Sequence, residues 1–269
     1  MTTCHAHPYR RVLAILALLA SSAALSAVAG SMAGPKEGLI TLKEPEGLSF
    51  SMAYVQSDRE MRFENRVTAV EFSHITAGVG LDILPSLALY AEAGTAGMQV
   101  GVIESTGGFE WGIGARAALW DTVIDGTPVV PRRHAIRLEV DVAYREASMK
   151  IDGVYFGQIT GTLAADLANT DDYFKWSELT ISPLIRYTHN RATESVWNRR
   201  HPTGISAYIG PIYSDWDIDH APLKGKGYHD MGMRLGADMR IANGWLIQLD
   251  AILFDGSDRH YTIGMGYYF

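Results

Sequence analysis

Cysteine is almost absent from this chain of 269 residues, and its single example, Cys4, lies before the first apolar run. A disulfide within the chain needs two cysteines, so none can form. An exported chain without disulfides must be stabilised by packing, by closure of a sheet or by a membrane. Cys4 also comes too early to be a lipid-attachment site at the end of a leader peptide.

Basic residues are too few for nucleic-acid binding. The sequence has 23 Lys and Arg against 30 Asp and Glu, and its formal net charge is −7. Nucleic-acid binders need a surplus of Lys and Arg, because these residues neutralise phosphates. We therefore expect no nucleic-acid partner.

Long apolar runs are also scarce, and the one extended run lies near the amino terminus. Arg10 and Arg11 precede the run VLAILALLASSAAL, and the small residues of SAVAG follow it. This order predicts a secretory signal peptide over residues 1–29, since a membrane-spanning helix needs about 20 apolar residues. We expect residues 30–46 to be a periplasmic segment and residues 47–269 to be one domain.

Alternation of apolar and polar residues dominates that domain. In MGMRLGADMRI, for example, the apolar side chains from Met231 to Ile241 share one face, and Arg234, Asp238 and Arg240 share the other. A period of two residues predicts β-strands. We expect about ten of them, near residues 47–57, 66–82, 85–95, 108–121, 132–147, 172–189, 203–214, 229–242, 244–255 and 259–269.

Two-faced strands suit either a soluble sheet with an apolar core or a barrel whose apolar face meets lipid. A strand of about 11 residues, tilted about 45°, crosses the roughly 25 Å apolar band of an outer-membrane barrel. The pattern favours an all-β fold, a closed antiparallel transmembrane β-barrel of about ten strands, with eight and twelve as alternatives. A soluble periplasmic barrel that binds an apolar ligand is the alternative fold.

Turn lengths predict the orientation of this barrel. The short connections DILPSL and IANGW, the latter with the hairpin signal Asn243-Gly244, fall on the periplasmic side if the chain ends there. The longer polar connections near residues 57–66, 96–107, 148–171 and 214–229 then fall outside. We expect two aromatic belts, an outer one with Tyr54, Phe109, Trp111, Tyr144, Tyr213 and Tyr261 and an inner one with Phe50, Tyr187, Trp245, Tyr267 and Phe269.

The carboxy-terminal GMGYYF is the most specific motif. With the leader peptide and the alternating strands, it resembles the small bacterial outer-membrane β-barrels of the OmpA-type, opacity-type and porin-like families. The resemblance implies a location in the cell outer membrane and an assembly signal, formed by Tyr267 and Phe269, that the outer-membrane assembly machinery reads. It also implies contact with outer-membrane lipid and lipopolysaccharide.

The polar strand faces predict a lumen that is filled by paired charges, because about ten strands leave little free space inside. Its expected members are Glu92, Glu110, Arg116, Arg137, Glu139, Asp141, Arg145, Glu178, Arg186, Arg234, Asp238, Arg240 and Asp250. We expect a structural or porin-like protein without a cofactor, whose external loops contact host or surface ligands. A narrow channel for small solutes is an alternative.

The segment DWDIDH is the remaining candidate for chemistry, since Asp215, Asp217, Asp219 and His220 crowd together at the expected outer rim. Calcium loops use such alternate oxygens, but the sixth position here is His220 and the twelfth is Lys226, so we predict no metal site. Omptin proteases are similar in architecture, being ten-stranded barrels with acidic residues and a histidine at the rim. That similarity keeps a surface hydrolase as a second alternative, with no catalytic residue assigned.

Overall fold

The computed structural model describes residues 47–63, 66–100, 103–125, 134–154, 173–190, 202–220, 223–228, 230–241, 244–256 and 258–269. The predicted signal peptide (residues 1–29) and periplasmic segment (30–46) lie outside this part of the chain. Among the described residues, no helix is long and apolar enough to cross a membrane.

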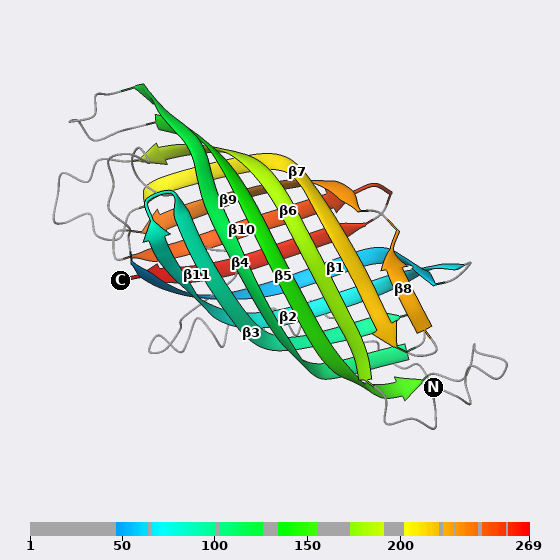
Figure 1. The fold of residues 1–269 in the computed structure, drawn as a ribbon. Helices are drawn as coiled ribbons and strands as arrows, with labels where there is room; N and C mark the ends of the chain where they lie inside the picture. The colour runs from blue at the N-terminus through cyan, green and yellow to red at the C-terminus, as the bar shows by residue number, and fades with distance from the viewer. Residues whose placement is uncertain are drawn as a thin grey trace, which may run out of the picture.

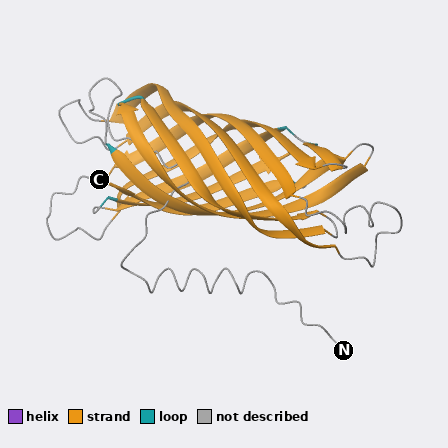
Figure 2. Ribbon diagram, turned by 60° about the horizontal axis from the view of Figure 1, so that its bottom comes forward, coloured by secondary structure: helices purple, strands orange, loops and turns teal. Residues whose placement is uncertain are grey.

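The described residues form eleven strands (Figures 1 and 2). Their bounds are β1 Leu48–Phe63, β2 Arg66–Leu84, β3 Leu87–Val100, β4 Ile103–Asp125, β5 His134–Val154, β6 Tyr173–Asn190, β7 Pro202–His220, β8 Leu223–Gly227, β9 Met231–Ile241, β10 Trp245–Phe254 and β11 Arg259–Tyr268.

The sheet closes on itself into a barrel. Each strand pairs antiparallel with the next one along the chain, except that β8 does not pair with β9, and β7 pairs with both of them. Closure comes from β11, which pairs with β1 from Ser49 opposite Tyr268 to Asp58 opposite Arg259. Ten strands, β1 to β7 and β9 to β11, therefore form the complete barrel, and the predicted closed antiparallel fold of about ten strands is confirmed.

The prediction of loops near residues 57–66 and 96–107 is wrong. Most of these residues continue the neighbouring strands. β1 extends to Phe63, and β4 already begins at Ile103. The segment near residues 214–229 is likewise built mainly from the end of β7 and from the unpredicted strand β8. Alternation continues in these segments with its polarity inverted, so that Asp58 and Glu60 point outward while Arg59 and Met61 point inward.

Strand length divides the barrel into two regions. β9, β10 and β11 have 11, 10 and 10 residues, close to the roughly 11 residues that cross an apolar band. β2 and β4 have 19 and 23 residues, so they extend well beyond that length. β8 pairs with the ends of both β7 and β1 beyond the short strands. We call the resulting eight-stranded ring, formed by the ends of β1 to β7 and by β8, the collar.

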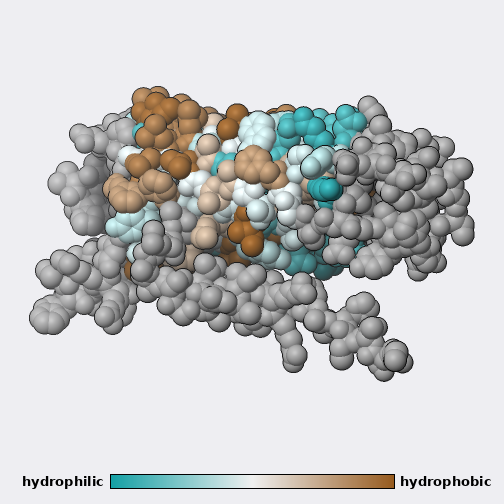
Figure 3. Space-filling view, turned by 90° about the horizontal axis from the view of Figure 1, so that it is seen from below, coloured by the Kyte–Doolittle hydropathy of each residue, from teal (hydrophilic) through white to brown (hydrophobic). Residues whose placement is uncertain are grey.

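The other region, which includes the carboxy terminus, has an apolar exterior that we call the belt. Exposed side chains such as Val79, Leu89, Ile185, Ile209 and Leu249 point outward from it. Figure 3 shows the difference along the barrel axis, with hydrophobic side chains towards the carboxy-terminal end and hydrophilic ones towards the collar. The belt therefore has the surface that a lipid environment favours, and the collar has the surface that water favours.

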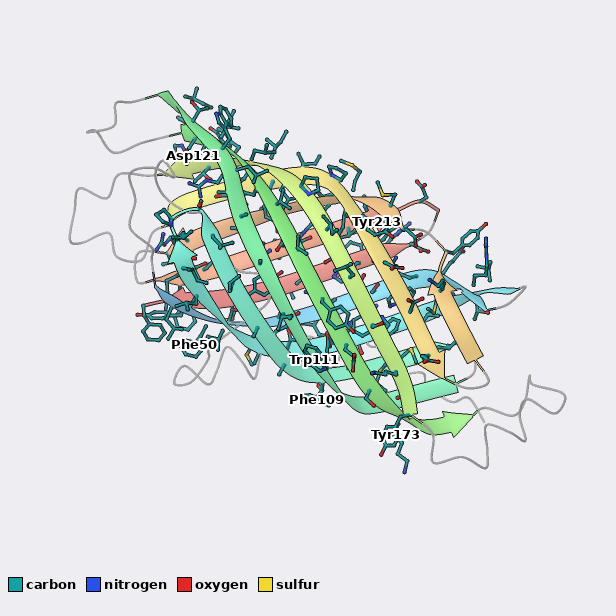
Figure 4. All side chains as sticks on the ribbon, in the orientation of Figure 1. Phe50, Phe109, Trp111, Asp121, Tyr173 and Tyr213 are labelled. Carbon is teal, nitrogen blue, oxygen red and sulfur yellow. The ribbon has the colours of Figure 1, made fainter. Side chains whose placement is uncertain are left out.

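Aromatic side chains mark both borders of the belt. Phe50 lies at the carboxy-terminal end, whereas Phe109, Trp111 and Tyr213 lie towards the collar, and Tyr173 lies in the collar opposite Lys150 (Figure 4). At the first border the rings are in contact, since Phe269 lies 5.5 Å from Phe50 and 4.9 Å from Tyr267 between centroids. At the collar border, Trp111 lies 5.7 Å from Tyr144.

Candidate functional site in the barrel lumen

The predicted lumen residues all lie on the inward faces of their strands. Eleven of the thirteen are buried, and Arg145 and Arg240 are partly buried. They come from β3 to β6, β9 and β10, and their side chains meet across the interior. The alternation of each strand is what positions them, because every second residue points to the same face.

Asp141 on β5 is the centre of one network. It accepts a hydrogen bond from Arg116 at 3.1 Å and one from Arg234 at 2.8 Å, and Tyr90 donates a third at 3.0 Å. Arg234 also donates to Asp250 at 2.8 Å. Two guanidinium groups and two carboxylates therefore compensate one another in the interior, where an unpaired charge costs several kcal/mol.

A second network lies nearer the carboxy-terminal end of the barrel. Arg186 on β6 donates to Glu139 at 2.9 Å and forms a further ion pair with Asp238 on β9. Arg137 lies 2.9 Å from Asp121 and 3.9 Å from Glu139, which links β4 to the same group. Acidic and basic side chains thus alternate across the lumen. Among the described residues at this level, no continuous path is lined by charges of one sign alone.

Tyrosine rings fill the space that the charges leave. Tyr90 lies over Gly114, and Tyr208 lies over Gly236, so closely that a Cβ at either glycine would overlap the tyrosine ring. Tyr208 also donates to Asp250 at 2.7 Å. Large residues therefore face glycines across paired strands, which packs the lumen closely.

A small chamber of about 50 Å³ lies between these networks and the collar. His74 and Glu110 line it, with their Nδ1 and Oε2 atoms 2.6 Å apart. Glu92 Oε2, Trp176 Nε1 and Asp250 Oδ1 belong to other lining residues, and these three atoms make no hydrogen bond to the protein. A chamber of this volume has room for about three to five water molecules, which can satisfy such groups.

An apolar cluster closes the chamber on its collar side. We call it the collar core, and its residues are Met61, Val70, Phe72, Ala96, Met98, Val100, Ala147, Met149, Trp176, Trp216 and Ile218. They come from β1, β2, β3, β5, β6 and β7, and they fill the interior of the ring instead of facing lipid. A close-packed apolar interior of this kind excludes water.

Arg59 lies at the boundary between the chamber and the collar core. Its guanidinium lies 4.6 Å from the Trp216 ring centroid and 4.0 Å from that of Phe254, and it donates to Glu178 at 2.9 Å. The charge is thus held between aromatic faces and a carboxylate, an arrangement that stabilises a desolvated cation.

The rim residues of DWDIDH do not converge on one point. Asp215, Asp217 and Asp219 occupy alternate outward positions of β7, while Trp216 and Ile218 between them enter the collar core. Asp217 lies 3.5 Å from Lys226 of β8. The side chain of His220 lies outside the described part of the structure. Among the described residues, no group of three or more His, Cys, Asp and Glu side chains is arranged to hold a metal ion.

Sequence reasoning missed Arg59 and the collar core, because both fall in or beside segments that it assigned to loops. The available signal was the inverted alternation of DWDIDH, in which large apolar residues alternate with carboxylates. His74 is also absent from the predicted lumen set. It shares its inward face with Phe72 and Thr76 in the middle of β2, at a position where Glu110 of β4 reaches it.

Comparison with known proteins gives fold neighbours only. No family model matches the chain, and no curated protein matches it. The translocator domain of the autotransporter NalP from Neisseria meningitidis is similar at 12% identity and a TM-score of 0.37, over 98% of this chain and 96% of that one. The outer membrane protease OmpT from Escherichia coli is similar at 10% identity and a TM-score of 0.38, over 82% and 96%.

A third neighbour is the CymD monoaromatic hydrocarbon channel, at 8% identity and a TM-score of 0.26, over 86% of this chain and 90% of that one. Identities and scores this low carry no argument about activity. The strand register, the belt and the charged lumen are by themselves those of an outer-membrane type of β-barrel. Its membership of the OmpA-type, opacity-type or porin-like families stays a prediction.

Proposed function

We propose that this protein is an integral outer-membrane β-barrel with a sealed lumen, which serves a structural role and presents its collar as a contact surface outside the membrane. The observation that carries the proposal is the double closure of the interior. The lumen networks pack the level of the belt, and the collar core fills the ring beyond it.

The channel alternative is disfavoured by the same observation. A solute path would have to pass both the ion pairs of the lumen and the apolar side chains of the collar core.

The His74–Glu110 pair is chemically suited to activate water, but the collar core lies between it and the collar end of the barrel. We therefore propose a function without catalysis, and the outward carboxylates of β7 support this because they do not converge.

Conductance in a planar bilayer tests the sealed lumen. The refolded, detergent-purified protein should insert and remain electrically silent, and heat-modifiable gel migration should confirm that it is folded. Steady single-channel openings by the folded protein would contradict the proposal and favour the narrow channel.

Assembly provides a separate test of the membrane location. We propose that Tyr267 and Phe269 are read by the outer-membrane assembly machinery, and the exposure of Phe269, at 71%, supports this. Deletion of Phe269 should lower the amount of folded protein in the outer membrane, measured by heat-modifiable migration of membrane fractions. Alanine at the exposed collar residue Lys150 is the control and should leave that amount unchanged; equal amounts for both variants would exclude the role of Phe269.

A further inference from the structure

Two histidines face each other on neighbouring strands at the carboxy-terminal border of the belt. His134 is the first residue of β5, at the end of this strand that lies away from the collar, and it is paired directly opposite His189 of β6. Both side chains are partly exposed. They point outward, since Arg137 and Arg186 point inward three positions away on the same strands. The pair therefore lies outside the lumen, where water can reach it.

The two rings are close enough to share one ligand. Their Nδ1 atoms lie 3.4 Å apart, and their centroids lie 4.6 Å apart. The hydroxyl of Tyr187, two residues before His189 on the same face of β6, contacts Nδ1 of His134. The rings of Tyr187 and His134 stack, with their centroids 5.7 Å apart. Two nitrogens and one oxygen from two strands thus meet at one point.

The separation of the two nitrogens is long for a hydrogen bond, but it fits a shared metal ion. Hydrogen bonds that an N–H group donates usually measure about 2.7 to 3.2 Å. A tetrahedral Zn²⁺ ion holds imidazole nitrogens at about 2.0 to 2.1 Å, which places two of them about 3.3 to 3.4 Å apart. Ligands at right angles, as in square-planar coordination, would lie about 2.9 Å apart. The observed 3.4 Å matches the tetrahedral arrangement.

Hydrogen bonding alone satisfies this arrangement poorly. Nδ1 of a neutral imidazole carries either one proton or one lone pair. Nδ1 of His134 faces both Tyr187 and His189, and a single proton or lone pair cannot point well at both. The strands also hold the pair in place, because the register of β5 and β6 runs from His134 to Lys150 without a bulge. The sheet therefore presents the two nitrogens as a preformed chelate, which lowers the cost of binding an ion.

We propose that His134 and His189 bind one Zn²⁺ ion in tetrahedral coordination through their Nδ1 atoms, with oxygens from the Tyr187 hydroxyl and from water in the remaining positions. Imidazole ligands favour Zn²⁺ and similar transition-metal ions over Mg²⁺ and Ca²⁺. Two histidines are fewer than the four protein ligands of a closed structural zinc site, so this ion exchanges with the surrounding water phase. When bound, it links β5 to β6 at the carboxy-terminal border of the belt.

Calorimetric titration of Zn²⁺ into the full chain, refolded in detergent and carrying no polyhistidine tag, tests the site. His134→Asn and His189→Asn should each weaken the binding of one ion by at least about tenfold, since even the outer partners of metal ligands contribute about 10- to 100-fold. His220→Asn makes the same change in DWDIDH and is the matched control, which should bind Zn²⁺ as the wild type does. An equal loss in His220→Asn would overturn the proposal.

The double variant His134→Asn/His189→Asn separates a shared site from two independent ones. It should lose a single equivalent of Zn²⁺, because the two residues hold one ion. A loss of two equivalents would overturn the proposal, since each histidine would then bind an ion by itself. Heat-modifiable gel migration confirms that each variant is folded, and His189→Gln replaces any single variant that is not.

Co²⁺ tests the geometry in the wild type, without any substitution. One equivalent of Co²⁺ should give the intense visible absorption of a tetrahedral ion, and an excess of Zn²⁺ should abolish it. An excess of Mg²⁺ or Ca²⁺ should leave it unchanged. The weak absorption of octahedral Co²⁺, or displacement of the ion by Mg²⁺, would contradict a tetrahedral histidine site.

Discussion

Strand β5 passes through both regions of the molecule, and its two halves follow opposite rules. At the level of the belt, Glu139 and Asp141 point into the lumen, and Val140 points out. In the collar, Met149 is fully buried inside, and Ser148 is exposed outside. The geometry of the strand is the same in both halves, so the difference reflects what surrounds each one. A wall in lipid must place its charges inside, and a wall in water can place them outside.

The interior of the belt region depends on paired charges, and this gives the largest expected effect. Arg234→Ala leaves the buried carboxylates of Asp141 and Asp250 without one of their partners and should lower the free energy of unfolding by about 3 to 5 kcal/mol. Urea unfolding in detergent micelles measures it. Asp217→Ala removes only an exposed ion pair with Lys226 and should cost less than about 1 kcal/mol; equal losses would contradict a packed polar lumen.

The interior of the collar depends on apolar packing. Met149→Ala creates a cavity in the collar core and should lower the free energy of unfolding by about 2 to 5 kcal/mol. Met233→Ala, at an exposed outward position of the belt, is the control and should cost much less, because no packed protein core surrounds that side chain. The same unfolding assay compares the two variants. A larger loss of free energy of unfolding for Met233→Ala than for Met149→Ala would mean that the apolar core has been assigned to the wrong face of the sheet.

One added charge should cost much more stability on the exterior of the belt than on the exterior of the collar. Val140→Lys places an ammonium group on the belt and should cost about 2 to 4 kcal/mol in a lipid bilayer. Ser148→Lys makes the same change eight residues further along β5, in the collar, and should stay within about 0.5 kcal/mol. Unfolding from lipid vesicles measures both. Similar costs at the two positions would mean that the belt and the collar share one environment.

The smallest effect is expected from the charges on the collar exterior. Lys175 and Glu146 lie 3.1 Å apart, and the Lys175 side chain is largely exposed. Lys175→Ala should lower the free energy of unfolding by less than about 1 kcal/mol. High salt screens this exposed pair, so through this pair it should lower the free energy of unfolding of the wild type by no more than Lys175→Ala does. A salt-sensitive loss as large as that of Arg234→Ala would show that this pair is structural.

Much of the belt region could be predicted from the sequence, because alternation is a local signal. Each of the ten expected segments overlaps a strand, and the prediction of the lumen residues used the same period of two. Of the predicted Asn243-Gly244 turn, the structure describes Gly244, which adopts a positive φ of 86° that favours glycine. These features need only neighbouring residues to be recognised.

The collar was not predicted, for a physical reason. A strand that lies between water and an apolar core carries polar residues on its outer face. In DWDIDH, the three carboxylates led to the prediction of a loop, although Trp216 and Ile218 alternate with them. Contacts between distant strands were also beyond reach, such as the pairing of β8 with β1 and the approach of Arg59 to Glu178. These depend on how the sheet closes, which no local pattern records.

The measurement that tests the polarity inversion most directly is spin-label accessibility at two positions of β5. Cys4 is the only cysteine, so a Cys4→Ser background allows Val140→Cys and Ser148→Cys to be labelled singly in protein reconstituted into lipid vesicles. We predict that oxygen, which concentrates in lipid, relaxes the label at position 140, and that a water-soluble nickel chelate relaxes the label at position 148. If the chelate relaxes both labels equally, the belt does not lie in the membrane and the account is wrong.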